Sequence, residues 1–154
     1  MIGAIGLHKK GEVTLEEITN YLQALPVYHS SGAIAYFVGV VREDPVVNAN
    51  SNVTRLEYEA YEDVALKRME EIRSEIKKRP GVTEVAIHHI IDALQVGEPS
   101  IFVAVLGKHR QEVFPALADA VERVKRDVPI WKKEFTTKDS YWVSTEHMAV
   151  NHSG

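Results

Sequence analysis

The stretch VTEVAIHHIIDALQVGEPSIFVAVLG, residues 82–107, decides the fold class of this chain. It contains two apolar runs that are rich in β-branched residues and therefore predict two strands, separated by QVGEP, whose Gly and Pro are typical of a turn. Strands joined by a short turn are antiparallel neighbours, whereas parallel neighbours need a long crossover. The stretch therefore favours an α+β fold over a doubly wound parallel sheet.

Outward from this stretch, the apolar patterns predict a mixed set of strands and helices. Strands are predicted at 1–7, 32–43, 53–61, 130–137 and 140–145, and the segment 32–43 is almost fully apolar, as in a buried strand. Helices are predicted at 14–25, 62–79 and 109–128, and the first of them begins with a capping box of Thr14 and Glu17. The buried faces of the two long helices are predicted to be Val64, Met69, Ile72 and Ile76, and Phe114, Leu117, Val121, Val124 and Val128.

Length and composition limit the possible functions. The 154 residues predict a single domain over 1–154, with a mobile loop at 43–52 and a frayed tail from about residue 145. A net charge of −4 argues against general attraction to nucleic acid or to anionic membranes. The absence of Cys excludes disulfides, thiolate metal sites and a Cys nucleophile. The sequence has no long apolar run and no signal-peptide pattern, so we expect a cytoplasmic location.

A local cluster of cations around DVPIWKKEF, residues 127–135, stands out against this acidic background. Lys125 precedes the stretch, and Lys132 and Lys133 follow Trp131 directly. Alternation along a strand sends Lys132 and Lys133 to opposite faces, so only one of them can point into a given pocket. The cluster is consistent with a ligand that combines a flat ring with negative charge, and also with ordinary cation–π contacts.

Lys125 has two readings. It lies about 40° from Val121 on the helical wheel, at the edge of the predicted buried stripe. Its stem could cover apolar surface while the ammonium group stays in water. Alternatively, burial and neighbouring cations would lower the pKa of a partly desolvated amine, which would make it usable as a nucleophile or base. The sequence leaves both readings open.

Three further residues are candidates for binding an anion. Arg42 ends an apolar strand, from which its guanidinium can reach a phosphate in a bidentate way. His109 and Arg110 begin a long helix, where free backbone N–H groups favour an anion. His88 and His89 are adjacent in a strand and face opposite ways, so they are poorly placed to share a metal ion. We therefore expect no metal site, and no cofactor.

Four segments together resemble the large, catalytic subunit family of molybdopterin synthase, over about Gly32 to Val143: GAIAYFVGVVRE, LEYEAYEDVALKRMEEI, VGEPSIFVAVLGKHRQEVF and VKRDVPIWKKE. The resemblance implies an α/β hammerhead-like fold with a mixed sheet and two long helices. It also implies a sulfurtransferase that converts cyclic pyranopterin monophosphate into molybdopterin by inserting dithiolene sulfur. The sulfur would arrive as a thiocarboxylate on the C-terminal glycine of a small ubiquitin-like subunit, and two large subunits would form a homodimer within a heterotetramer.

The resemblance also assigns residues by position. Lys125 and Lys132 match the two lysines that the family treats as catalytic, and Arg42, His109 and Arg110 match its anion-binding residues. Lesser pocket positions of the family match Val40, Val41, Lys133 and Glu134.

The chain departs from the family pattern just before the VGE turn. Where the family commonly has His-Arg-hydrophobic-Gly, this chain has His89-Ile90-Ile91-Asp92, and the loop 43–52 lacks the usual Gly. The departure implies an altered turn and favours, as an alternative, a non-catalytic module that holds a phosphorylated pterin or a protein partner. A purely structural dimer subunit is a third reading. The matching lysines favour the enzyme.

Overall fold

The computed structural model describes residues 2–44, 53–136, 140–143 and 149–151. Along the chain the elements are β1 (Ile5–His8), α1 (Leu15–Gln23), the 3₁₀ helix η1 (Pro26–Ser30), β2 (Ala33–Val40), β3 (Arg55–Ala60), α2 (Glu62–Lys77), β4 (Val82–Ile90), β5 (Ala93–Gln95), β6 (Pro99–Gly107), α3 (Arg110–Asp127), β7 (Ile130–Phe135), β8 (Ser140–Val143) and β9 (Ala149–Asn151). Most of the loop predicted at 43–52 and most of the predicted frayed tail lie outside the described residues.

The main sheet has the strand order β1-β4-β6-β2. Its centre is the pair predicted from the sequence: β4 and β6 are antiparallel, with Ala86 opposite Ala104, and the link between them turns at Gly97, whose φ is 91°. The positive φ is a conformation that Gly adopts without steric cost. Because β1 runs parallel to β4, the sheet is mixed, and the predicted α+β fold is confirmed.

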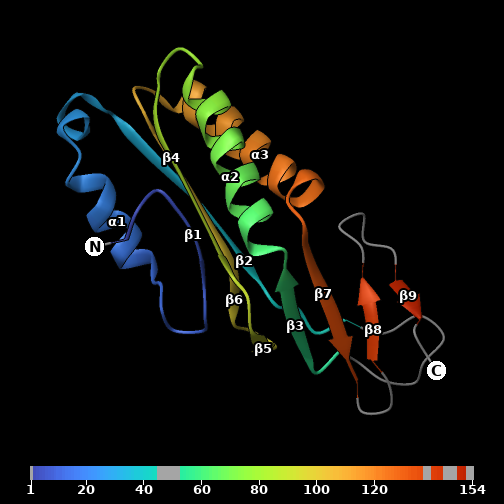
Figure 1. Cartoon of the computed structure of the whole chain (residues 1–154). Coiled ribbons are helices and arrows are strands. Elements are labelled where there is room, and N and C mark those ends of the chain that lie inside the picture. Colours follow the sequence, from blue (N-terminus) through green and yellow to red (C-terminus); the bar gives the residue numbers. More distant parts are fainter. Residues whose placement is uncertain (1, 45–52, 137–139, 144–148, 152–154) are drawn as a thin grey trace.

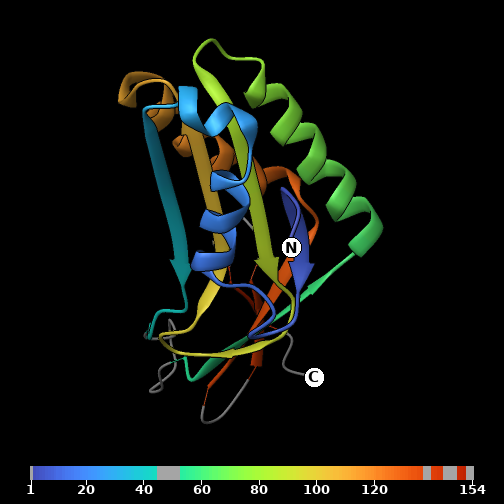
Figure 2. The same cartoon turned by 90° about the vertical axis from the view of Figure 1, so that its left-hand side faces the viewer.

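Helices cover both faces of the main sheet. In Figure 1, α2 and α3 lie side by side along one face, and Figure 2 shows α1 lying across the opposite face. The predicted capping box begins α1: Thr14 Oγ1 accepts from the Glu17 N–H at 3.2 Å, and the Thr14 N–H donates to Glu17 Oε2 at 3.0 Å. The sheet is therefore the middle layer of three.

The second sheet has the order β5-β3-β7-β8-β9 and lies beyond one end of the main sheet (Figure 1). The IWKKEF strand, β7, is its centre and pairs antiparallel with β3, with Tyr58 opposite Lys132 and Glu59 opposite Trp131. Of the predicted tail, Ala149–Asn151 forms β9, which pairs with β8. This sheet brings the cation-rich stretch against the end of the main sheet.

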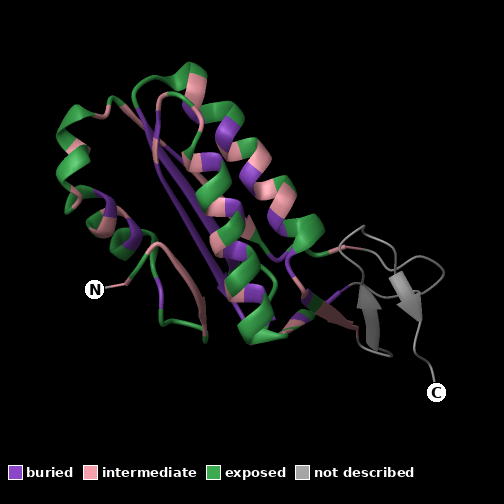
Figure 3. Ribbon diagram, turned by 45° about the horizontal axis from the view of Figure 1, so that its top comes forward, coloured by how far each residue is buried: buried purple, intermediate pink, exposed green. Residues whose placement is uncertain are grey.

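Two hydrophobic cores occupy the two sides of the main sheet, seen as purple strands between the helices in Figure 3. The prediction for β2 was partly wrong, because the strand ends at Val40 and forms an edge of the sheet, where most of its residues are only half-buried. An edge strand has a neighbour on one side alone and is therefore less covered.

The predicted buried faces of the two long helices need two corrections. Phe114 is 61% exposed, and the residues of α3 that are buried are Val113, Ala116, Ala120 and Val124. Val64 is also exposed, and Ala65 takes its place on the buried face of α2. In both helices Ala residues are part of the buried face, because their small side chains let the helix backbone approach the strands closely.

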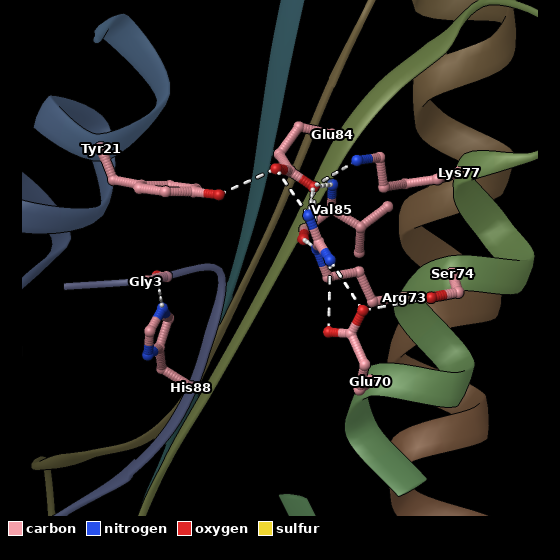
Figure 4. Close-up of polar contacts among 9 residues, drawn as sticks. All are labelled: Gly3, Tyr21, Glu70, Arg73, Ser74, Lys77, Glu84, Val85 and His88. Atoms are coloured by element: carbon pink, nitrogen blue, oxygen red, sulfur yellow. Dashed lines mark hydrogen bonds and ion pairs between the residues drawn. The ribbon is translucent and has the colours of Figure 1, made fainter. Parts of the chain in front are cut away.

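A buried carboxylate ties the three layers together (Figure 4). Glu84 of β4 accepts two hydrogen bonds from the Arg73 guanidinium of α2, both at 2.9 Å, and one from the Tyr21 hydroxyl of α1 at 2.8 Å. The cost of burying this charge is offset because every neighbour donates to it. No helix in the described ranges combines the length and apolar character needed to cross a bilayer.

Candidate functional site

A cleft of about 710 Å³ lies where the second sheet meets the main sheet. Its walls come from the end of β2 and the residues after it, from β3, β4, β6 and β7, and from the last turn of α3. Five of the residues predicted for the site line it: Val40, Arg42, Lys125, Lys132 and Glu134.

The end of α3 explains why the two lysines meet. The helix ends at Asp127, Pro129 follows, and the chain enters β7 at Ile130. Lys125 therefore lies in the last helical turn, while alternation along β7 turns Ile130, Lys132 and Glu134 toward the cleft.

Lys132 is the amine that the protein removes from water. Burial lowers the pKa of its ammonium group, because desolvation disfavours the charged form. Glu134 and Asp44 oppose this shift, and the positive charges of Lys125 and Arg42 add to it. The net lowering of the pKa increases the fraction of neutral amine, which makes Lys132 suited to proton transfer.

Lys125 stands at the cleft with its ammonium group closer to solvent. Its Nζ lies 5.4 Å from the centroid of the Phe37 ring, a cation–π arrangement. Its charge also acts on His89, where it disfavours protonation of the imidazole. The residue is exposed, as in the first reading of the sequence, and it also lines the cleft.

Arg42 lies at the mouth of the cleft, where its side chain is 81% exposed and its Nε is 2.8 Å from Asp44 Oδ1. Val40 is also exposed at this rim, whereas Val41 points away into the second hydrophobic core. The Val41 N–H donates to the Glu98 carbonyl at 2.9 Å, which fixes the backbone beside Arg42. The mouth therefore presents a guanidinium that an anionic ligand can reach.

Glu134 places a carboxyl group among these cations. Burial raises its pKa, the negative charge of Asp44 raises it further, and Lys132 opposes both. A carboxyl group with a raised pKa and an amine with a lowered pKa in one cleft are the perturbed groups expected of an acid–base site.

Besides Val41, three predicted site residues lie away from the cleft of their own chain. Lys133 points to the opposite face of β7, where its Nζ is 5.4 Å from the Phe135 ring centroid. His109 and Arg110 are at the N-terminus of α3, about 22 Å along the helix from Lys125. His109 Nδ1 lies 3.4 Å from Glu112 Oε1 there. One chain therefore does not bring the whole predicted set together.

The cleft floor contains polar residues that sequence reasoning missed: Tyr58, His89 and Ser100. They come from β3, β4 and β6 in turn. The alternation of β4 does separate His88 from His89, but only tertiary packing decides which of the two borders a cavity. Among the described residues, no three His, Cys, Asp or Glu side chains are grouped so as to hold a metal ion.

The site can therefore bind an anionic group at its cationic mouth, receive a ring on its neutral floor and move a proton at Lys132. Such a combination suits a phosphorylated heterocycle.

Comparison with known proteins gives a consistent result. Residues 8–127 match a family model described as MoaE protein. The molybdopterin synthase catalytic subunit of Pyrococcus abyssi is 40% identical over 149 residues, which cover 95% of this chain and 99% of the relative. The crystal structure of molybdopterin synthase from Staphylococcus aureus is 32% identical, with a TM-score of 0.80 over 92% of this chain and 98% of that chain.

A more distant structure shares the fold. It is a protein–protein complex of subunits 1 and 2 of molybdopterin-converting factor from Helicobacter pylori 26695. It is 22% identical to this chain, with a TM-score of 0.71 over 90% of this chain and 88% of that chain.

Proposed function

The chain belongs to the MoaE protein family, and from this premise we propose that it is the catalytic subunit of a molybdopterin synthase. In this role it is a sulfurtransferase that inserts dithiolene sulfur into cyclic pyranopterin monophosphate. The single observation that carries the proposal is the convergence of Lys125, Lys132 and Arg42 on one cleft, from α3, β7 and the end of β2.

Arg42 and Lys125 bind the phosphate in this proposal. Both are basic side chains at the exposed side of the cleft, where a phosphate enters without being fully desolvated. A guanidinium offers paired N–H donors to phosphate oxygens, and an ammonium group adds a point charge.

Lys132 and Glu134 carry the proton transfers. The lowered pKa of Lys132 and the raised pKa of Glu134 place both groups nearer to neutral pH than exposed Lys and Glu. General acid–base catalysis is most efficient when the pKa of the group is close to the working pH. Lys125, which lines the same cleft as Lys132, is the second catalytic lysine.

The partner is a small ubiquitin-like subunit that carries sulfur as a C-terminal thiocarboxylate. The chain has no Cys of its own, so the sulfur must arrive from another molecule. A thiocarboxylate is an anion on a narrow peptide tail, and the cation-lined cleft offers it the same attraction as the phosphate.

A second copy of the chain completes the site by supplying His109 and Arg110. β2 is an edge strand of the main sheet. Its first residue, Ala33, pairs with Gly107 near the start of α3, while its last residue, Val40, lines the cleft. A partner that runs antiparallel along this edge would bring its own His109 and Arg110 toward the cleft, because the two ends of β2 would exchange places. The homodimer is thus part of the proposal.

Reconstitution tests the function. The chain is mixed anaerobically with a thiocarboxylated small subunit and cyclic pyranopterin monophosphate, and molybdopterin is measured. The wild type should form product, and Lys125→Ala should abolish it. Lys67→Ala, which removes an exposed lysine of α2 outside the cleft, is the matched control and should retain activity. Full activity of Lys125→Ala would show that the assigned chemistry is wrong.

A non-catalytic binding module is the second candidate, favoured by the departure at His89-Ile90-Ile91-Asp92. Ile90 is buried in the second hydrophobic core, and Asp92 accepts from the Lys10 and Ala93 N–H groups at 3.1 and 2.8 Å. The two substituted positions therefore stabilise the turn and lie outside the cleft lining, which favours the enzyme. Binding of the precursor without product formation would favour the module.

A further inference from the structure

The floor of the cleft is neutral and polar, unlike its cationic mouth. The Ser100 side chain is near enough to the Tyr58 hydroxyl to act on its pKa, and Ser100 Oγ donates to the Gly39 carbonyl at 3.3 Å. The third floor residue, His89, is 7% exposed and meets Tyr58 edge to face, with ring centroids 5.0 Å apart. Packing against Tyr58 holds the imidazole in one orientation.

The hydrogen bonding of His89 fixes its tautomer. Its Nδ1 lies 2.9 Å from the carbonyl oxygen of Ile90, which can only accept. Nδ1 therefore carries the proton, and in a neutral imidazole the other nitrogen, Nε2, is a bare acceptor. Burial lowers the pKa of His89 to about 4, and the charge of Lys125 contributes, so the ring stays neutral near pH 7.

His89 lines the cleft and keeps a small exposed surface. No protein group hydrogen-bonds to its Nε2 in the described part of the chain. In the described residues, Glu112 Oε2 is the one side-chain polar atom that is both fully buried and without a hydrogen-bond partner. His89 Nε2 also has no partner but is not such an atom, so it keeps some accessible surface. Nε2 lies at the far end of a side chain that lines the cavity. A ligand in the cleft can therefore reach it.

We propose that His89 is a specificity-determining residue whose Nε2 accepts a hydrogen bond from a ring N–H of the bound substrate. An acceptor without a donor function selects a ligand N–H or O–H and rejects a bare lone pair. The cations at the mouth hold the phosphate, so the ring system lies over Tyr58 and His89. A reduced pterin presents several N–H groups along its edge.

This inference rests on the proposed function, because it takes the substrate to be cyclic pyranopterin monophosphate. It goes beyond that function by assigning a recognition role to a residue whose chemistry differs from that of the cationic site. It also separates two tasks within one cleft: anion binding at Arg42 and Lys125, and reading of the heterocycle at His89.

Steady-state kinetics with the thiocarboxylated small subunit test the inference. His89→Phe keeps a flat ring against Tyr58 but lacks the acceptor, and should raise KM for cyclic pyranopterin monophosphate about tenfold while kcat changes little. His89→Gln can again offer an acceptor and should recover most of the loss. His88→Gln, on the opposite face of the same strand, is the matched control and should leave KM unchanged.

The possible outcomes separate the two claims. An active wild type together with an unchanged KM in His89→Phe overturns the role of His89 and leaves the proposed function intact. A folded wild type that neither binds the precursor nor forms product overturns the proposed function instead.

An NMR measurement on the wild type covers the case in which His89→Phe does not fold. In protein labelled with ¹⁵N-histidine, His89 should show a protonated Nδ1 and a bare Nε2 at neutral pH. The Nε2 resonance should shift when cyclic pyranopterin monophosphate is added. A protonated Nε2, or an Nε2 signal that does not respond to saturating substrate, contradicts the inference even if no variant can be purified.

Discussion

At the scale of single residues, the adjacent histidines of β4 show how one strand serves two purposes. His89 faces the cleft, whereas His88 faces the opposite side of the sheet and is fully buried. His88 Nε2 lies 3.1 Å from the Gly3 carbonyl, which can only accept, so His88 Nδ1 is bare and accepts from His8 Nε2 at 2.8 Å. The His88 ring is therefore neutral in the folded chain.

The buried histidines make stability depend on pH. Burial lowers the pKa of His88 to about 4, with His8 contributing, and burial likewise lowers that of His89 to about 4. The unfolded chain binds protons with the ordinary His pKa of 6.5, so it takes up protons at a pH at which the folded chain does not. The stability that depends on these neutral rings should be fully present above pH 6.5. The free energy of unfolding should then fall as the pH drops toward 4, by at most about 1.4 kcal/mol per pH unit for each histidine.

Urea unfolding between pH 7 and pH 5 measures this slope, in a range above the ordinary pKa values of carboxyl groups. His88→Gln removes one of the buried titrating groups and should give a shallower slope than the wild type. A free energy of unfolding that stays constant from pH 7 to pH 5 would contradict the assignment of neutral, buried rings.

At the scale of elements, α3 shows what a periodic pattern predicts well and what it does not. The existence of the helix and its end before Pro129 follow from the sequence, as does the capping box of α1. Of the predicted buried face, Val124 and Val128 are buried and Leu117 and Val121 are partly buried, so the prediction was wrong only at Phe114. Ala116 and Ala120 are instead fully buried, and the Phe114 side chain is exposed. Close approach of backbones favours small residues, and hydropathy alone does not encode that distance.

This packing predicts effects of different size for one chemical change at two nearby positions of α3. Ala120 is fully buried against the sheet, so Ala120→Leu should lower the free energy of unfolding by about 1–3 kcal/mol through overpacking. Ala118 is exposed, and Ala118→Leu should change it by no more than about 0.5 kcal/mol. Chemical denaturation of both variants measures the difference. Equal effects would mean that α3 does not approach the sheet through its alanines.

At the scale of the whole molecule, the sequence predicted which residue types belong to the site better than it predicted how one chain arranges them. Lys125, Lys132 and Arg42 meet in the cleft because a helix end, a central strand and an edge strand converge there. No sequence pattern marks the floor residues Tyr58 and Ser100 as part of a site, since each is a single hydroxyl-bearing residue in an otherwise ordinary strand. His109 and Arg110 had a local signal, yet a single chain leaves them at the other end of α3.

The proposed dimer accounts for that separation, and mixing two variants tests it. If Arg110 serves the cleft of the partner copy, Arg110→Ala and Lys125→Ala damage the site from different chains. A mixed dimer then contains one site with both changes and one with neither. Random reassociation should restore about a quarter of wild-type sites, so molybdopterin formation should rise well above the mean of the two variants.

The matched control mixes Lys125→Ala with Lys132→Ala. Both lysines lie in the cleft of one chain, so every site in that mixture keeps a lesion and activity should not recover. Recovery in neither mixture would mean that Arg110 acts on its own chain or outside the reaction, and the second copy would lose its role in the site.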